Sequence, residues 1–216
     1  MRKQMNGEED WELKPTMDTP EQAFWKWFLQ HEGDLLHFEG DMERIFNELA
    51  AELGKVDRNL CFEFGPCDER REFVISAGGI KASFSAAVSL AKAAPPLDHW
   101  RITAFRPRRP TLNRIEIRGK CVDPDDVQVA LLDNGKIAGI YLFIPNFHED
   151  AIDLKQIGYL MLDEALGEFD VETRVGLIKM LPLNAQTDVE RYPLTELPRL
   201  FDQLVARLED RSEEPS

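Results

Sequence analysis

The chain has 216 residues, which is enough for one domain with a sizeable core or for two small domains. Its hydrophobic content of 43% and charged content of 31% are typical of globular proteins, and its net charge of −14 disfavours general binding to nucleic acid or anionic membranes. No apolar run approaches a membrane span, and no apolar stretch follows Arg2 and Lys3 as in a secretion signal. Three cysteines without paired spacing fit a reducing compartment, so we expect a cytoplasmic protein.

The N-terminal region predicts two helices behind a loosely ordered segment over residues 1–18. Thr19 followed by Pro20, with Gln22 three positions after the threonine, is a favourable helix start. This helix carries four large aromatic residues before Gly33, namely Phe24, Trp25, Trp27 and Phe28. They predict burial in the core or, alternatively, a surface for self-association in a homodimer. Residues 41–53 predict a second, amphipathic helix that ends at Gly54.

Residues 59–105 predict a strand–turn–strand–helix–strand unit. Large apolar residues alternate over residues 60–64, and turn residues separate this strand from a return strand over residues 72–77. An alanine-rich helix begins near Ser83 or Ser85 and ends at Pro95-Pro96, and residues 99–105 form the third strand.

Residues 126–181 repeat that order without detectable residue identity. Asn134-Gly135 between two apolar runs predicts a hairpin over residues 127–144, followed by a helix that ends at Gly167 and a strand over residues 174–181. Two such ββαβ units predict one α+β domain over residues 19–210. We expect a single, mostly antiparallel sheet of six or seven strands, covered by helices that include both terminal ones.

The segment from residue 101 to residue 120 is strongly basic. It holds seven of the 26 basic residues of the chain and one acid, Glu116. Its basic residues are Arg101, Arg106, Arg108, Arg109, Arg114, Arg118 and Lys120. Guanidinium groups suit bidentate pairing with carboxylates or phosphates. The segment therefore either neutralises acidic helices of the same chain or binds a small anion or an acidic protein partner. Nucleic acid is not expected, because no aromatic residues interleave with the arginines.

Several acidic positions have competing interpretations. Asp163, Glu164, Glu168 and Asp170 oppose the dipole at the end of the predicted helix, so they predict internal ion pairs or part of a binding site. Residues 123–126 lack the ligand pattern of a calcium loop. His31 and His37 have no defined ligand spacing, and we predict neither a metal nor a cofactor.

The tail over residues 194–210 predicts an amphipathic helix that docks on the domain or pairs with a second copy, before a frayed end at residues 211–216. No phosphate-loop, dinucleotide, serine-hydrolase or zinc-protease motif is present, and there is no Cys-x-x-Cys pair. We interpret Cys61, Cys67 and Cys121 as packed thiols. Glu63 is expected on the exposed sheet face near Ser76, Arg101 and Thr103, where it could help bind a polar ligand. These patterns leave open whether the protein is an enzyme.

Three segments, FWKWF, APPLDHWRITAFRPRR and LDEALGEFDVETRVG, resemble those of uncharacterised bacterial proteins, over roughly residues 24–182. The resemblance implies a bacterial cytosolic origin and no assigned activity. We therefore expect a non-catalytic bacterial protein that binds a protein partner in a regulatory or immunity-like role. The alternative is a domain, with or without catalytic activity, that binds a small molecule or anion through the sheet face and its arginine rim.

Overall fold

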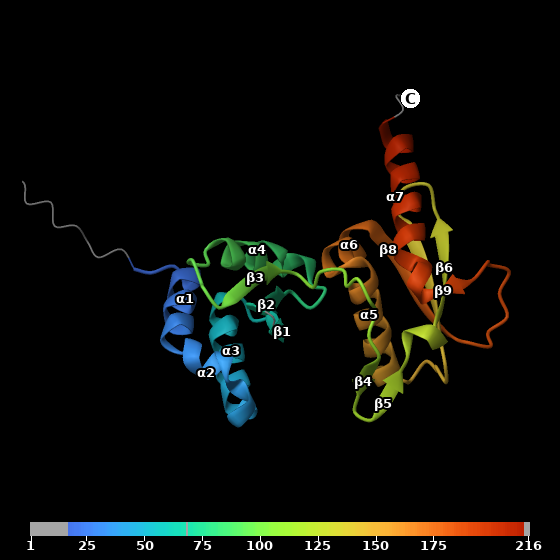
Figure 1. The fold of residues 1–216 in the computed structure, drawn as a ribbon. Coiled ribbons are helices and arrows are strands. Elements are labelled where there is room, and N and C mark those ends of the chain that lie inside the picture. The colour runs from blue at the N-terminus through green and yellow to red at the C-terminus, as the bar shows by residue number, and fades with distance from the viewer. Residues whose placement is uncertain (1–16, 68, 214–216) are drawn as a thin grey trace, which may run out of the picture.

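The computed structural model describes residues 17–67 and 69–213 and shows an α+β protein with two lobes (Figure 1). We name residues 20–105 the N-terminal lobe, residues 115–213 the C-terminal lobe, and residues 106–114 the linker. Each lobe has its own cluster of buried apolar residues. Nearly all of the segment that we expected to be loosely ordered, residues 1–16 of 1–18, lies outside the described residues.

The N-terminal lobe places three helices and a fourth, crossover helix around a three-stranded sheet of order β1-β2-β3. Its elements are α1 (Pro20–Gln30), α2 (Glu32–Leu36), α3 (Met42–Val56), β1 (Cys61–Cys67), β2 (Arg71–Ser76), α4 (Phe84–Lys92) and β3 (Trp100–Ala104). The predicted capping box is confirmed, since the Thr19 side chain accepts a hydrogen bond from the Gln22 N–H and Gln22 Oε1 accepts one from the Thr19 N–H. The helix through Gly54 does not end there but continues to Val56.

Aromatic residues form the core of the N-terminal lobe. Phe24, Trp25 and Phe28 of α1 are buried, and all three rings pack against Phe73 of β2. The Trp25 indole N–H also donates to the Leu90 carbonyl at 2.8 Å, which fixes α1 to α4. The aromatic face of α1 is therefore a core face.

The C-terminal lobe contains the hairpin β4-β5 and a four-stranded sheet of order β8-β7-β6-β9. Its elements are β4 (Ile115–Ile117), β5 (Lys120–Val122), β6 (Gln128–Asp133), β7 (Ala138–Ile144), α5 (Ile152–Leu166), α6 (Glu168–Arg174), β8 (Val175–Pro182), β9 (Tyr192–Pro193) and α7 (Leu197–Glu213). The residues that join β6 to β7 include Asn134, whose side chain accepts hydrogen bonds from the N–H groups of Lys136 and Ile137.

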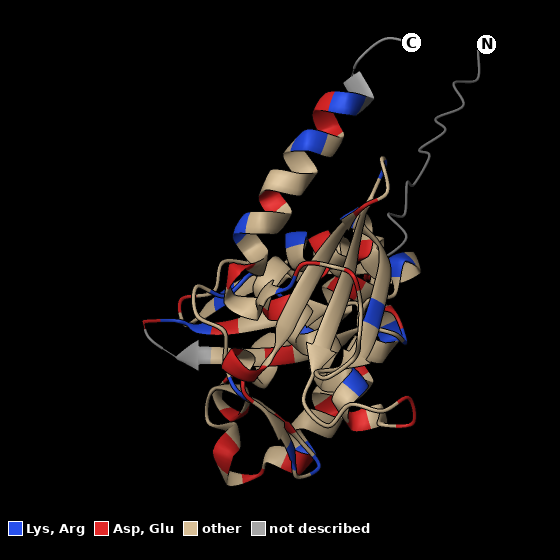
Figure 2. Ribbon diagram, turned by 90° about the vertical axis from the view of Figure 1, so that its right-hand side faces the viewer, with Lys and Arg blue, Asp and Glu red and all other residues tan. Residues whose placement is uncertain are grey.

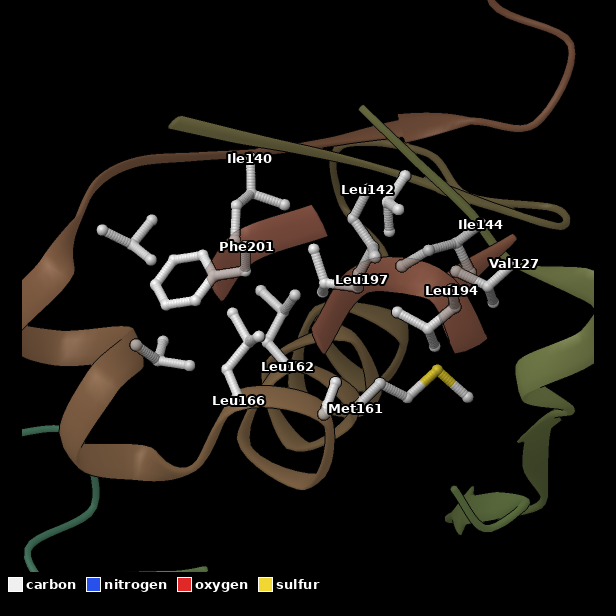
Figure 3. Packing of buried hydrophobic residues seen from close by; sticks show 14 of the residues in the cluster. Val127, Ile140, Leu142, Ile144, Met161, Leu162, Leu166, Leu194, Leu197 and Phe201 are labelled. Atoms are coloured by element: carbon white, nitrogen blue, oxygen red, sulfur yellow. The ribbon is translucent and has the colours of Figure 1, made fainter. Parts of the chain in front are cut away.

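One face of this sheet packs on α5 and α7. Ile140, Leu142 and Ile144 of β7 point toward Leu162 of α5 and Phe201 of α7 (Figure 3), and all five are almost completely buried. The tail helix therefore docks on the sheet. In Figure 2 the strands lie in front of these helices, so the other face of the sheet is turned to the viewer.

The prediction of one mostly antiparallel sheet of six or seven strands is wrong. Both ββαβ units form, but each builds its own small sheet in which the last two strands are parallel: β2 with β3, and β7 with β8. The crossover helix is the physical reason, because a strand–helix–strand connection returns the chain in the same direction. Within the described residues, no strand of one sheet pairs with a strand of the other.

The elements that the sequence analysis missed include α2, α6, β5 and β9. The chain resumes a helix, α6, directly after Gly167, whose φ of 83° turns the backbone between α5 and α6. The strands β5 and β9 have only three and two residues, too few for a period of two to be visible. Among the described helices, none combines the length and apolar character that crossing a membrane requires.

Candidate functional site

The linker crosses the polar face of the N-terminal sheet. Strand register places Cys61, Glu63, Glu72 and Ser76 on this face, opposite the aromatic core. The sequence predicted that the face would be exposed, but Glu72 and Ser76 are buried. The polar face is therefore the floor of an interface between the lobes, and this interface carries the charged groups of interest.

Arg106 is the first linker residue and lies at the centre of that interface. Its Nε donates to a Glu63 carboxylate oxygen, and its Nη1 donates to Asp163 Oδ2 at 3.2 Å. Nη1 also lies 3.9 Å from Glu168 Oε2, and Nη2 lies 3.9 Å from the Cys61 sulfur. One guanidinium thus connects a strand of the N-terminal lobe with both α5 and α6.

Glu168 is the most deeply buried of these carboxylates, with no solvent-exposed surface. Its Oε1 accepts from the N–H groups of Ala77 at 3.0 Å and Gly79 at 3.2 Å, and its Oε2 accepts from the Arg106 N–H at 3.1 Å. The turn after β2 contains Gly78 and Gly79, whose φ values are 58° and 75°. Glycine adopts this conformation without steric cost, and it directs the turn toward Glu168. The carboxylate of one lobe therefore satisfies main-chain donors of the other.

A cavity of about 610 Å³, which we name the inter-lobe cleft, opens beside this network. Gly78, Gly79 and Arg106 line one side, and residues from β4, α5 and α6 line the other. The C-terminal lining residues are Ile117, Gln156, Tyr159, Leu160, Asp163 and Glu172. The cleft therefore offers an apolar wall together with two carboxylates, an amide, a phenol and the Arg106 guanidinium.

Burial changes the acidity of both cleft carboxylates. It raises the pKa of Asp163 to about 7, because the loss of hydration outweighs the opposing charge of Arg106, and the charge of Glu168 adds to the rise. Burial also raises the pKa of Glu172, with Lys81 opposing and Glu168 reinforcing the shift. Asp163 thus exchanges a proton near neutral pH, inside a cavity that reaches solvent.

Two further arginines of the linker, Arg108 and Arg109, pair with acids of the same chain. Arg108 binds both oxygens of Asp202, one oxygen of Asp170, and the Leu166 carbonyl at 2.7 Å. Arg109 Nη1 donates to the buried Glu72 at 2.8 Å. Arg108 thus binds the linker to the C-terminal lobe, and Arg109 binds it to the N-terminal sheet.

Arg101 is exposed, and its guanidinium lies 3.7 Å from the second oxygen of Glu72. The hydroxyl of Thr103 donates to the same oxygen of Glu72 at 3.4 Å. The strand register places Arg101, Thr103 and Glu63 on one sheet face, as expected, and on that face the first two contact Glu72 while Glu63 pairs with Arg106. Ser76 accepts from the Gly78 N–H and belongs to the turn that Glu168 caps.

The remaining predicted residues lie on the β4-β5 hairpin. Arg114, beside β4, donates to the Cys121 sulfur, and Arg118 donates to Asp153 at 3.2 Å while 75% of its side chain stays exposed. Lys120 is also exposed. The structure therefore separates the predicted basic cluster into an internal set at residues 106–109 and an exposed set on this hairpin.

Within the described residues, no three histidine, cysteine, aspartate or glutamate side chains are placed to hold a metal ion together. His31 stacks on Trp27, and its Nδ1 lies 2.8 Å from the Trp27 carbonyl oxygen. Cys61 and Cys121 are free thiols, each half-buried beside an arginine, and the side chain of Cys67 lies outside the described part.

No protein-family model, curated protein or solved structure matches the chain in the three comparisons. The geometry of the inter-lobe cleft is therefore the basis for the functional argument. Sequence reasoning singled out Asp163 as a carboxylate at an unfavourable helix end, but it did not place Asp163 beside Arg106, which is 57 positions earlier in the chain. It missed Gln156, Tyr159 and Glu172, and their spacing on two helices gave no distinctive signal.

Proposed function

We propose that the protein binds a small molecule with a cationic or hydrogen-bond-donating group in the inter-lobe cleft. The observation that carries this proposal is Asp163, a carboxyl with a pKa of about 7 in the lining of a cavity of about 610 Å³. Burial keeps the pKa of this carboxyl high, because the charge of Arg106 does not offset the loss of hydration. A ligand cation supplies further positive charge.

The charges around the cleft support the same ligand class. Four carboxylates, those of Glu63, Asp163, Glu168 and Glu172, face the guanidinium of Arg106 and the more distant ammonium of Lys81. With all groups ionised, negative charge exceeds positive charge by two. A small anion, which the sequence also suggested, would add to that excess.

The apolar wall indicates the rest of the ligand. Ile117, Leu160 and the half-exposed ring of Tyr159 line the cleft on the side away from Arg106. Ligand sites commonly combine such apolar surface with a few polar groups that fix orientation. The ligand that fits is a primary amine or guanidine with a short apolar body, and the Gln156 amide is available for a further hydrogen bond.

A thermal-shift screen tests this proposal, with small primary amines and guanidines in one panel and carboxylates of matched size in the other. A ligand of the first panel should raise the Tm with increasing concentration, because it binds only the folded state. Asp163→Asn should abolish this rise. Asp153→Asn, on the same helix but outside the inter-lobe cleft, should preserve it. A response only to carboxylates, or an amine response that survives Asp163→Asn and Glu172→Gln, would contradict the proposal.

An acidic protein partner remains a second candidate, supported by the exposed hairpin with Arg114, Arg118 and Lys120. These three exposed cations belong to a protein of net charge −14 and lie on a hairpin that packs on α5. Replacing all three by glutamate should abolish capture of such a partner and leave amine binding in the inter-lobe cleft unchanged. Capture that tolerates the triple variant would remove this candidate.

A further inference from the structure

Two carboxylates from different helices line the inter-lobe cleft. Asp163 lies near the end of α5, and Glu172 lies in α6, the helix that follows. Both helices are on the side of the C-terminal lobe that faces the N-terminal lobe (Figure 1). Among the described residues that line the cleft, Arg106 is the only cation. The lining therefore holds two acids and one base.

The charge of Arg106 is divided among several carboxylates. Its Nε donates to Glu63, whereas its Nη1 lies 3.2 Å from Asp163 Oδ2 and 3.9 Å from Glu168 Oε2. Glu63 and Glu168 do not belong to the lining of the cleft, so part of this charge is used outside the cleft. Because one guanidinium faces three carboxylates, Asp163 is only partly neutralised and can pair with a further cation.

Glu172 has no partner of this kind. Within the part of the chain that the structure describes, its side chain forms no hydrogen bond, and no cation lies within 4.0 Å of its carboxylate. Lys81 opposes the effect of burial on the pKa of Glu172, but Lys81 is exposed and lies at a greater distance. The carboxylate lies against Gly79, where an added Cβ would be 2.9 Å from Glu172 Oε1. Glu172 therefore offers a second acceptor in the cleft, apart from the contact between Asp163 and Arg106.

The two carboxylates are close enough to interact, and apolar side chains line the cleft beside them. Burial is the main cause of the raised pKa of Asp163, and the charges of Glu168 and Glu172 add to the rise. Ile117 and Leu160 line the cleft together with the half-exposed ring of Tyr159. A methylene chain that packs on this surface leaves water, which favours binding. At about 610 Å³ the cleft has the size that small-molecule sites usually have.

We propose that the ligand of the inter-lobe cleft is a linear aliphatic diamine, whose two ammonium groups pair with Asp163 and Glu172 and whose methylene chain lies on the apolar wall. This inference rests on the proposed function, because it specifies the amine that the cleft binds. A dication matches the excess of two negative charges that the ionised carboxylates around the cleft have over Arg106 and Lys81. A monoamine balances only one of these charges.

Isothermal titration calorimetry of the full chain tests the inference with diaminobutane, diaminopentane and diaminohexane, each aminated at both ends. Each diamine is compared with the amino alcohol of the same carbon chain, in which a hydroxyl replaces one ammonium group. Length and apolar surface then stay nearly constant while one charge is removed. At least one diamine should bind about tenfold or more tightly than its amino alcohol, which corresponds to about 1.4 kcal/mol.

Glu172→Gln identifies the partner of the second ammonium group. Because the Glu172 side chain makes no hydrogen bond within the described residues, the fold should survive, and circular dichroism checks this. The variant should bind the diamine and the amino alcohol with similar affinity. Glu48→Gln, the same change on the exposed face of α3, should keep the preference for the diamine.

The outcomes separate this inference from the proposed function. If the amino alcohols bind and no diamine binds more tightly, the inference is wrong while the proposed amine site stands. A preference for the diamine that persists in Glu172→Gln would also overturn the inference. If neither class of compound binds, the proposed function fails together with it.

Discussion

Arg106 and Glu168 exchange hydrogen bonds across the lobes: the Arg106 N–H donates to Glu168 Oε2 at 3.1 Å, and the Glu168 N–H donates to the Arg106 carbonyl at 3.0 Å. This reciprocal pair attaches the linker to the start of α6. Because Glu168 also accepts from Ala77 and Gly79, its carboxylate is the point at which both lobes and the linker meet.

Glu168→Ala should destabilise the protein by about 3–5 kcal/mol, since it leaves buried donors without an acceptor. It should also uncouple the lobes. All four tryptophans precede residue 106, so fluorescence reports on the N-terminal half while far-ultraviolet circular dichroism reports on both halves. In urea, the two signals should coincide for the wild-type protein and separate for the variant.

Glu48→Gln is the control for this experiment, because Glu48 pairs with Arg44 on the exposed face of α3. This change should lower the free energy of unfolding by less than about 1 kcal/mol. Coincident curves in the wild-type protein would support the single domain predicted for residues 19–210. Separate curves in the wild-type protein would contradict it.

Asp163 should make stability fall with rising pH. Its pKa is about 7 in the folded state and near 3.8 in the unfolded chain, so the folded state binds more protons between these values. The stabilisation of the folded state that comes from protonated Asp163 is present below about pH 4 and is lost as the pH approaches 7. Comparison with Asp163→Asn isolates this effect of Asp163. Between about pH 4 and pH 7, the free energy of unfolding of the wild-type protein should fall relative to that of the variant by on the order of 3 kcal/mol. A constant difference across this range would show that Asp163 titrates normally.

Phe169 should stabilise the interface although 49% of it is exposed. Its ring lies 5.6 Å from that of Phe105 and 6.0 Å from that of Phe84, so one aromatic residue of α6 closes a cluster from the other lobe. Phe169→Ser should lower the free energy of unfolding by about 1–2 kcal/mol. Ile152→Ser, at a more exposed position, should cost less than about 0.5 kcal/mol, and equal effects would contradict the structural role of Phe169.

Gly167 and Gly33 should respond oppositely to alanine. Gly167 has a φ of 83°, so Gly167→Ala should destabilise by about 1 kcal/mol or more through backbone strain. Gly33 lies in α2, and an added Cβ there would have no neighbour within 4 Å. Gly33→Ala should therefore be neutral or stabilising by up to about 1 kcal/mol, and thermal unfolding of both variants checks the sign.

Local features were predictable because their causes are local. The capping box at Thr19, the hairpin at Asn134-Gly135 and the apolar stripe of α7 are encoded within a few positions, and the structure confirms them. Sheet membership was not predictable, because pairing of β2 with β3 and β7 with β8 depends on where each crossover helix packs. The alternating pattern of residues 60–64 is compatible with a small sheet or with a large one.

The inter-lobe cleft was only partly predictable for the same reason. The composition of the sequence indicated the arginines of residues 106–109 and the acids near Gly167 as candidate site residues. The structure places both sets at the interface between the lobes. Their partners are up to 94 positions apart, as with Arg108 and Asp202, and no local pattern encodes such a pairing. The internal use of residues 106–109 and the exposure of the hairpin arginines became distinguishable only in three dimensions.

The way the linker is held has a practical consequence for trypsin. This protease cleaves after arginine or lysine in locally extended chain unless proline follows, so the Arg108–Arg109 bond is the cleavage site within residues 106–109. Here the main chain of Arg106 is held by Glu168 and that of Arg109 by the Glu164 carbonyl, so cleavage requires the lobes to separate first. The rate of nicking in this segment should therefore measure how often the native molecule opens.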